Sequence, residues 1–360
     1  MKITTYHSPN ELPPEIKSRW SYPEQAGFLT SLDWFRTLAA TGIAEDFEPR
    51  IYVVLTNEDA VAAAIACCFR RGERTLRSLT TFYSTEFDVH APYSAVGIDR
   101  IADAFAAYVA SERPAWSALD LRYFRSESPF KAALSRSLEQ HGFSVQEFFQ
   151  YETWFESIRN ADYKAYFAAR PSQLRNTVTR REKKLKREHQ CEIRIGRTDD
   201  AATEALVRDF ITVYSGSWKQ PEPFPNFIPA LTRAAASCGV LRLGVLYVDQ
   251  VPAAAQLWLT TANRTTIYKL AYDEKYREQS VGSILSAELF RIAIEEDKVA
   301  EIDYGIGSEP YKRDWMTAVR RIVGIEAYNR RTLRGLSMIA IRQISRMVRR
   351  FRRVAPAKQN

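Results

Sequence analysis

The segment IDYGIGSEPYK (302–312) places a carboxylate, two phenols and an amine directly after a short stretch that is expected to be a strand. Such groups can move protons and stabilise an oxyanion, which are the two needs of acyl transfer to an amine. We expect Asp303 and Tyr311 to be catalytic, with Tyr311 giving a proton to a leaving thiolate. The alternative for Asp303 is a capping or ion-pairing role within the fold. Tyr304 and Lys312 lie at the same strand end and are further candidates.

A second candidate site follows a strand that ends at Tyr272 and Asp273, where REQSVGS (277–283) opens a helix. The first N–H groups of a helix have no partner within it, and the helix dipole favours phosphate there. Gly282 lets a pyrophosphate approach the main chain. The alternative is a helix start with a structural role alone. The expected donor contacts are Tyr272, Gln279, Ser280, Val281, Gly282 and Ser283.

Other polar or aromatic residues are candidates for the acceptor side. Successive strand residues face opposite ways, so only one of Tyr268 and Lys269 can face the site, and Lys269 is our choice. Trp218, after Ser-Gly-Ser, is expected to form a wall. Arg175, Arg180 and Arg181 share a helix, but their spacing does not form a single phosphate clamp. The residues predicted to contact substrate here are Arg175, Trp218, Gln256, Lys269 and Tyr304.

An internal repeat indicates which elements position these residues. Residues 50–82 align without a gap on 241–273, and both read as three short strands. The similarity continues from 94–105 to 280–290, with a glycine in register, and from 119–131 to 302–312. We therefore predict an α/β (α+β) fold of two domains, each a mixed, mostly antiparallel sheet flanked by helices. The predicted segments are 1–157, 158–330 and a tail at 331–360.

Composition narrows the function classes. The 360 residues are long enough for two domains, and their net charge of +8 favours anionic partners. No apolar run is long enough to span a membrane, and the N-terminus lacks the apolar core of a secretory signal. The four cysteines and four histidines show no metal-type spacing, so we expect no metal site and reduced thiols. A cytoplasmic location is the expectation.

The chain resembles the GNAT acyltransferase superfamily, and more narrowly the tandem group with CelD-type acetyltransferases and Fem-type peptidoglycan bridge transferases. The resemblance covers nearly the whole chain and is clearest in the C-terminal half. It implies acyl-CoA or an acyl carrier protein as co-substrate and no permanently bound cofactor. Gln279 and Gly282 fit the turn that holds the CoA pyrophosphate, but Ile284 replaces its last small residue. Fem-type transferases, whose donor is aminoacyl-tRNA, share that departure. The segments that carry the resemblance are SQLRNTVTRREKKLKRE (172–188), SGSW (215–218), 239–259, 268–285 and 302–315.

The resemblance also implies roles for two single residues. Lys312 matches a lysine that follows an Asp-aromatic-Gly strand end in Fem-type enzymes, where it would stabilise negative charge. Asp88, in the loop 80–93, matches an aspartate of the Fem-type acceptor side; the alternative is a flexible surface loop. No glutamine of the CoA turn occurs near Gly97, so the first copy is expected to have lost donor binding.

These observations favour an N-acyltransferase that acts by direct attack of an amine on a sugar, lipid precursor or amino-acid derivative. No serine or cysteine sits with a histidine base in a recognisable motif, so a covalent intermediate is not expected. One alternative is aminoacyl-tRNA-dependent peptide-bond formation, the only case in which we expect a nucleic-acid partner. The missing helical hairpin of many Fem-type enzymes argues against it. A second alternative is a degenerate GNAT pair that acts as a binding module.

The tail from Arg330 to Arg353 contains nine arginines and no acid, with apolar residues at spacings of three to four. That pattern is typical of a basic amphipathic helix. We expect its apolar stripe to pack on the C-terminal domain up to about Ile341, and 342–354 to make peripheral contact with an anionic membrane, at the inner membrane surface.

Overall fold

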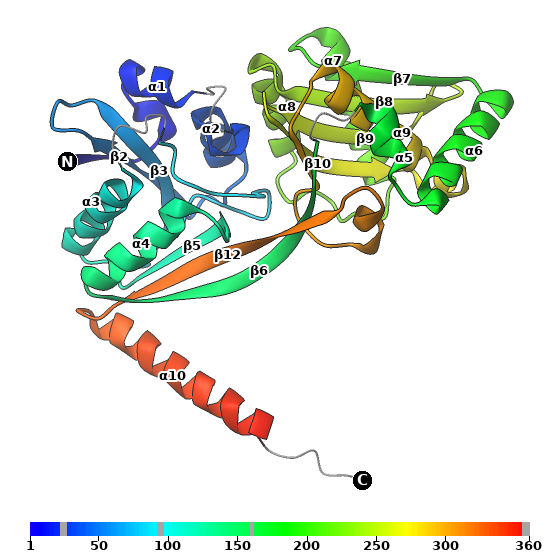
Figure 1. Ribbon diagram of the computed structural model, residues 1–360. Helices are drawn as coiled ribbons and strands as arrows, with labels where there is room; N and C mark the ends of the chain where they lie inside the picture. Colours follow the sequence, from blue (N-terminus) through cyan, green and yellow to red (C-terminus); the bar gives the residue numbers. More distant parts are fainter. Residues whose placement is uncertain (22–26, 92–96, 159–161, 355–360) are drawn as a thin grey trace. The chain divides into compact units, whose positions relative to one another are not determined.

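The computed structural model describes residues 1–21, 27–91, 97–158 and 162–354, with side chains described up to Ile344 in the last range (Figure 1). The chain forms two compact units that interleave in sequence. Unit 1 contains 1–16, 44–150 and 322–360, and unit 2 contains 17–43 and 151–321. The repeat predicted continuous segments instead. Two long strands, β6 (Phe143–Ser157) and β12 (Ala318–Asn329), carry the chain from one unit into the other.

Unit 1 is a sheet with strand order β1-β2-β3-β4-β5-β12-β6. Strands β4 and β5 are parallel, and the pairs β1/β2, β2/β3, β3/β4 and β5/β12 are antiparallel. Its other strands are β1 (Lys2–Tyr6), β2 (Phe47–Leu55), β3 (Val61–Arg70), β4 (Thr75–Ser78) and β5 (Ala118–Arg125). Helices α3 (Ile98–Ser111) and α4 (Pro129–Gln140) pack on each other, and α10 (Leu333–Val354) follows β12. The short helix α1 (Pro14–Trp20) leads into unit 2, and η1 (Pro9–Glu11) precedes it.

Unit 2 repeats this topology with strand order β6-β11-β10-β9-β8-β7, in which β10 and β11 are parallel and the other pairs are antiparallel. Its strands are β7 (Cys191–Gly196), β8 (Leu241–Val248), β9 (Val251–Thr260), β10 (Arg264–Tyr272) and β11 (Glu301–Asp303). The helices are α2 (Leu32–Thr41), α5 (Tyr163–Ala168), α6 (Ser172–Glu188), α7 (Ala201–Ser215), α8 (Phe227–Ser237) and α9 (Val281–Arg291). Short helical turns are η2 (Phe28–Thr30), η3 (Glu274–Gln279), η4 (Ile292–Glu296) and η5 (Pro310–Asp314).

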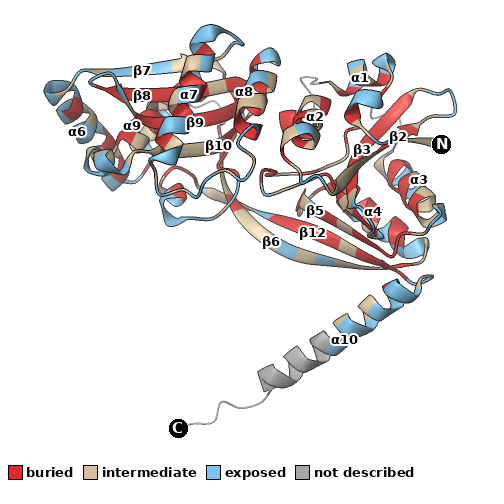
Figure 2. Ribbon diagram, turned by 180° about the vertical axis from the view of Figure 1, so that it is seen from behind, coloured by how far each residue is buried: buried red, intermediate tan, exposed pale blue. Residues whose placement is uncertain are grey.

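Both units therefore place three antiparallel strands before a helix and a strand that runs parallel to the third, as the repeat predicted. The middle strands β3 and β9 are buried over nearly their whole length (Figure 2). Strands covered on both faces read as continuous apolar runs, which explains the sequences VAAAIACC and AAAQLWL. The predicted fold class, a mixed and mostly antiparallel sheet flanked by helices, is confirmed.

One expectation about the tail is wrong. The apolar stripe of α10 does not pack against the protein up to Ile341, because Leu333 and Leu336 are 89% and 47% exposed. Among its first residues only Gly335 is buried. No helix in the described residues is long and apolar enough to cross a membrane.

Candidate active site

In unit 2, β10 and β11 pair over only three residues, and the last pair joins Thr266 to Asp303. Strand β10 continues to Tyr272 beside β9, with a register shift between Ile267 and Lys269. Beyond Asp303 the chain turns away through two glycines with positive φ, Gly305 and Gly307. The second half of β10 therefore has no strand neighbour on its β11 side in the described chain. The candidate residues lie around this divergence.

Asp303 is buried and all its contacts are internal. One carboxylate oxygen accepts hydrogen bonds from Thr153 Oγ1 at 2.8 Å and from the Gly305 N–H at 2.7 Å. The other pairs with Arg320 at 3.0 Å, and Arg320 also pairs with Glu301. Burial raises the pKa of Asp303, although the charge of Arg264 opposes the shift. The geometry favours the paired, positioning role over that of a free catalytic base.

Lys312 is 3% exposed, and its ammonium fixes the loop that follows β11. Nζ donates to the backbone oxygens of Ile306 at 2.5 Å and Gly307 at 3.1 Å, and pairs with Glu309 at 2.7 Å. It also lies 5.4 Å from the centre of the Tyr304 ring. Burial lowers the pKa of Lys312 against the opposing effect of Glu309. Lys312 is thus a buried ammonium that two loop carbonyls and Glu309 hold in place.

The two tyrosines of the loop differ in exposure. Tyr304 is 3% exposed, and Tyr311, which meets it edge-on at 5.8 Å, is 43% exposed. Burial raises the pKa of both phenols, and the Glu309 charge raises that of Tyr311 further. A raised pKa keeps the phenol protonated at neutral pH. Tyr311 can therefore donate a proton to a group in solvent reach, whereas Tyr304 is a packing residue beside Lys312.

The loop after α7 adds charged residues that the sequence analysis missed. Lys269 pairs with Glu222 at 2.5 Å, and its Nζ lies 5.3 Å from the Tyr214 ring centre. Burial lowers the pKa of Lys269, and the charge of Lys219 also acts to lower it. The same Lys219 charge acts on the pKa values of Lys312 and Glu309. Lys219, Lys269 and Lys312 therefore lie in one neighbourhood. The only sign of this in the sequence was that Lys219 follows Trp218, a predicted substrate contact.

The predicted phosphate turn is formed by η3 and the start of α9. Its pivot is Ser280, a non-glycine residue in the left-handed region at φ 56°. Such strained positions cluster at functional sites. An ideal Cβ on Gly282 would lie 3.2 Å from the Tyr272 ring, and Tyr272 in turn contacts the Trp218 ring at 4.6 Å. Gly282 thus has to be small in order to pack against Tyr272, a reason that the sequence did not reveal.

The remaining residues of this turn surround the helix start. Val281 is buried, Ser283 is partly exposed, and Gln279 has a buried Oε1 without a hydrogen-bond partner. Gln279 lines a small cavity of about 60 Å³ together with Arg181 and Lys184 of α6. Glu188 and Glu278 line the same cavity, so its walls carry both signs of charge.

Two predicted substrate contacts bond within unit 2, and a third belongs to unit 1. Gln256 is 1% exposed and bonds only within the fold: it donates to Gly282 O at 3.0 Å and Ser286 Oγ at 2.8 Å, and accepts from Trp258 Nε1. It therefore braces the start of α9. Arg175 donates to the backbone oxygen of Arg170 at 3.1 Å. Asp88 belongs to unit 1.

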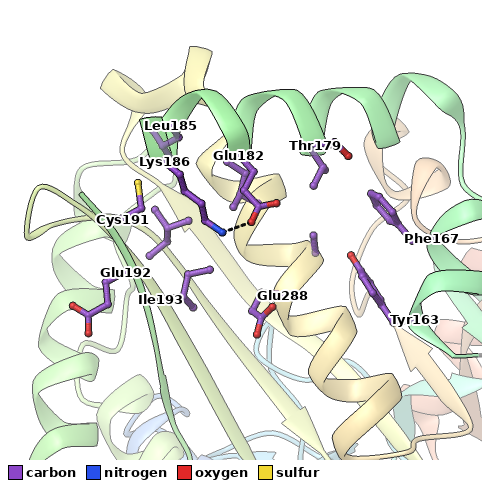
Figure 3. Close-up of a pocket in the computed structure, with 14 residues that line it drawn as sticks. Tyr163, Phe167, Thr179, Glu182, Leu185, Lys186, Cys191, Glu192, Ile193 and Glu288 are labelled. Atoms are coloured by element: carbon purple, nitrogen blue, oxygen red, sulfur yellow. Dashed lines mark hydrogen bonds and ion pairs between the residues drawn. The ribbon is translucent and has the colours of Figure 1, made fainter. Parts of the chain in front are cut away.

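One cavity of unit 2 is lined by other residues. A pocket of about 420 Å³ lies over the sheet between α5, α6 and α9 (Figure 3). Its walls are the stacked rings of Tyr163 and Phe167, aliphatic residues, and the Glu182–Lys186 pair. None of the residues predicted for catalysis or donor binding lines it, so we place the site at the β10/β11 divergence. No group of residues in the described chain could hold a metal ion.

Comparisons with known proteins bear on the fold of the chain. Residues 172–313 match the family model described as an acetyltransferase (GNAT) domain. A crystal structure of FemX is similar with a TM-score of 0.59 at 10% identity, covering 91% of this chain and 97% of that one. A tandem GNAT protein from the clavulanic acid biosynthesis pathway is similar with a TM-score of 0.50 at 12% identity, covering 90% and 98%.

A third similar structure is the C-terminal domain of a putative lysylphosphatidylglycerol synthetase from Agrobacterium fabrum, with a TM-score of 0.52 at 12% identity, covering 86% and 91%. No curated protein sequence matches the chain. At these identities the structures establish the fold. Residues 172–313 therefore match a GNAT acetyltransferase domain, and the chain as a whole has the fold of these FemX and tandem GNAT structures.

Proposed function

We propose that the chain is an N-acyltransferase that moves an acyl group from acyl-CoA or an acyl carrier protein to an amine of a sugar, lipid precursor or amino-acid derivative. The observation that carries the proposal is that Lys269 lies on β10, and Tyr311 and Lys312 lie in the segment after β11, where these two strands part. The helix start at Ser280 lies at the end of the same strand β10, next to Tyr272.

The residues suit direct attack. The donor phosphates lie at the N-terminus of α9, and the thioester carbonyl lies beside β10, where the positive charge of Lys312 stabilises the oxyanion. The amine nitrogen forms a bond to the carbonyl carbon, and the carbon–sulfur bond breaks. Tyr311 gives its proton to the thiolate and takes back the proton that the attacking amine releases. The proton count balances without a separate base.

The test uses the full chain with acetyl-CoA, a long-chain acyl-CoA or an acyl carrier protein thioester, and with an amino sugar, ethanolamine or lysine as acceptor. Thiol release and the mass of the product report turnover. We expect Tyr311→Phe to lower kcat by about 100-fold while donor affinity, read from thermal stabilisation by CoA, is unchanged. Tyr108→Phe in unit 1 is the control. If Tyr311→Phe keeps full turnover, the phenol has no part in proton transfer.

Aminoacyl-tRNA remains the second donor candidate, and one observation favours it. Helix α6 exposes six cations that a phosphate backbone could contact, three of them paired with glutamates of the same helix: Arg180, Arg181, Lys183, Lys184, Lys186 and Arg187. Release of amino acid from charged tRNA onto an amine, with no thiol release from acyl-CoA, would select this donor. If neither donor reacts and CoA gives no stabilisation, the chain is a binding module.

A further inference from the structure

Helix α10 presents its apolar side to solvent. Leu333, Leu336 and Ile344 are 89%, 47% and 58% exposed, and Ala340 is also exposed (Figure 2). At 100° per residue these four side chains fall within one third of the helix circumference. A helix that packs on its own domain buries such a stripe. Here the stripe points away from the residues that hold the helix.

The opposite side of the helix is attached to unit 1. Arg342 forms an ion pair with Glu326 of β12 and lies over the Tyr328 ring at 5.6 Å. Met338 and Ile339, on that same side, are partly buried. An ideal Cβ on Gly335 would lie 2.1 Å from the backbone oxygen of Asn329, so the first turn sits directly against the end of β12.

The start of α10 is also fixed by hydrogen bonds. Thr332 Oγ1 accepts from the Gly335 N–H at 3.0 Å, as an N-cap does. The Asn329 side chain accepts from the Arg331 N–H at 2.9 Å and donates to Trp116 O at 2.9 Å. This anchoring fixes the rotation of the helix about its axis, so the outward direction of the stripe follows from the fold.

We propose that α10 lies on an anionic membrane surface, with Leu333, Leu336, Ala340 and Ile344 in the lipid boundary. The segment from Arg330 to the end of the chain has nine arginines and no acidic residue. An amphipathic helix with a cationic polar face and an apolar face lies in the plane of a membrane interface. Anionic headgroups attract the arginines, whereas a second copy of the same helix would bring like charges together. The apolar stripe also favours lipid over nucleic acid, whose phosphates would need only the arginines.

The experiment is co-sedimentation of the full chain with vesicles of phosphatidylcholine alone and of phosphatidylcholine mixed with phosphatidylglycerol. We expect binding to the mixed vesicles, weakened by salt, and little binding to phosphatidylcholine. The double variant Leu336→Asp/Ile344→Asp should lower the fraction bound by about tenfold or more, because two charged side chains replace the apolar anchors. Both residues are exposed, so folding should be intact, and the thermal melting curve checks this.

The matched control is Ile211→Asp, which changes an exposed apolar residue of α7 that is 40% exposed. It should bind mixed vesicles as the wild type does. Equal binding by the α10 variant and the wild type, or equal binding to both vesicle types, would overturn the proposal. A smaller oligomer mass of the variant in light scattering, with lipid binding unchanged, would also overturn it. So would binding of duplex DNA by both wild type and variant when neither binds lipid. The expected results do not depend on acyl transfer.

Discussion

The two copies of the repeat differ at the end of their third strand. In unit 2, β10 runs on to Tyr272 and its β11 side has no strand neighbour after Thr266 in the described residues. In unit 1, β4 stops at Ser78, and the chain itself fills the corresponding position. His90 exchanges two backbone hydrogen bonds with Ala64 of β3, and the Phe87 N–H donates to Tyr123 O at 2.8 Å. Unit 1 thus fills this position with a loop that includes the buried Phe87, whereas unit 2 has no strand there in the described residues.

The loop after the fourth strand shows the same divergence. Both copies end this loop on a buried lysine, Lys131 in unit 1 and Lys312 in unit 2, which are 7% and 3% exposed. Each holds a loop carbonyl and a glutamate: Lys131 donates to Ser126 O at 2.9 Å and pairs with Glu147. Only Lys312 has a tyrosine pair and a second lysine, Lys219, near it. The two lysines thus hold corresponding loops in different surroundings.

The largest expected effect on turnover comes from replacing Lys312 and, for comparison, the corresponding Lys131 of unit 1. Lys312→Met should lower kcat by about 100- to 1,000-fold because it removes the charge that faces the oxyanion. Lys131→Met removes the same kind of buried ammonium and should leave turnover near the wild-type value. Both variants should lose similar unfolding free energy, about 1–3 kcal/mol, since each leaves a glutamate and a carbonyl without their partner. Steady-state kinetics and urea denaturation measure the two quantities.

A loss of turnover that follows the loss of stability equally in both lysine variants would break the comparison. Lys312 would then be the same structural residue as Lys131.

The glycine pair should give a smaller effect. An added side chain at Gly282 crowds the Tyr272 ring, whereas no described atom lies within 4 Å of an ideal Cβ at Gly97, the aligned glycine before α3. Gly282→Val should weaken donor binding by about tenfold, because the shifted ring disturbs the helix start that holds phosphate. Gly97→Val should bind the donor normally. Titration calorimetry with CoA measures both, and equal affinities would assign the turn a structural role alone.

The smallest effect concerns Asp88, in the segment that fills unit 1. Burial raises the pKa of Asp88 from its ordinary 3.8 to about 6, so the folded chain binds this proton more tightly than the unfolded chain. The contribution of Asp88 to the free energy of unfolding should therefore be greatest below about pH 4 and fall as the pH rises through about 6. Asp88→Asn should be more stable than the wild type at neutral pH by about 1–2 kcal/mol and no more stable at low pH.

Urea denaturation across this pH range tests the prediction for Asp88, with Asp99→Asn, whose side chain is 74% exposed, as the control. If Asp88→Asn has wild-type stability and instead raises the KM for the amine, the segment contacts the acceptor as the resemblance implies.

The sequence by itself determined the local elements and their repetition. The aligned segments 50–82 and 241–273 predicted the three strands of each copy, β2–β4 and β8–β10. The helix start near Gly282 and the site-bearing segment 302–312 also followed from local pattern. These features depend on neighbours within a few residues, so their information is present in a short stretch of chain.

Tertiary structure alone decided which side each residue faces and which distant residues it meets. Gln256 and Lys269 are both polar strand residues, yet one turns inward to brace α9 and the other joins Glu222, which lies 47 positions away in the sequence. The interleaved units have the same origin, because the return of β12 beside β5 and the packing of α2 on α8 join segments far apart in the chain. The outward direction of the α10 stripe was likewise set by the ion pair of Arg342 with Glu326. Periodicity determines the faces of an element but not which face is covered, and only long-range packing makes that choice.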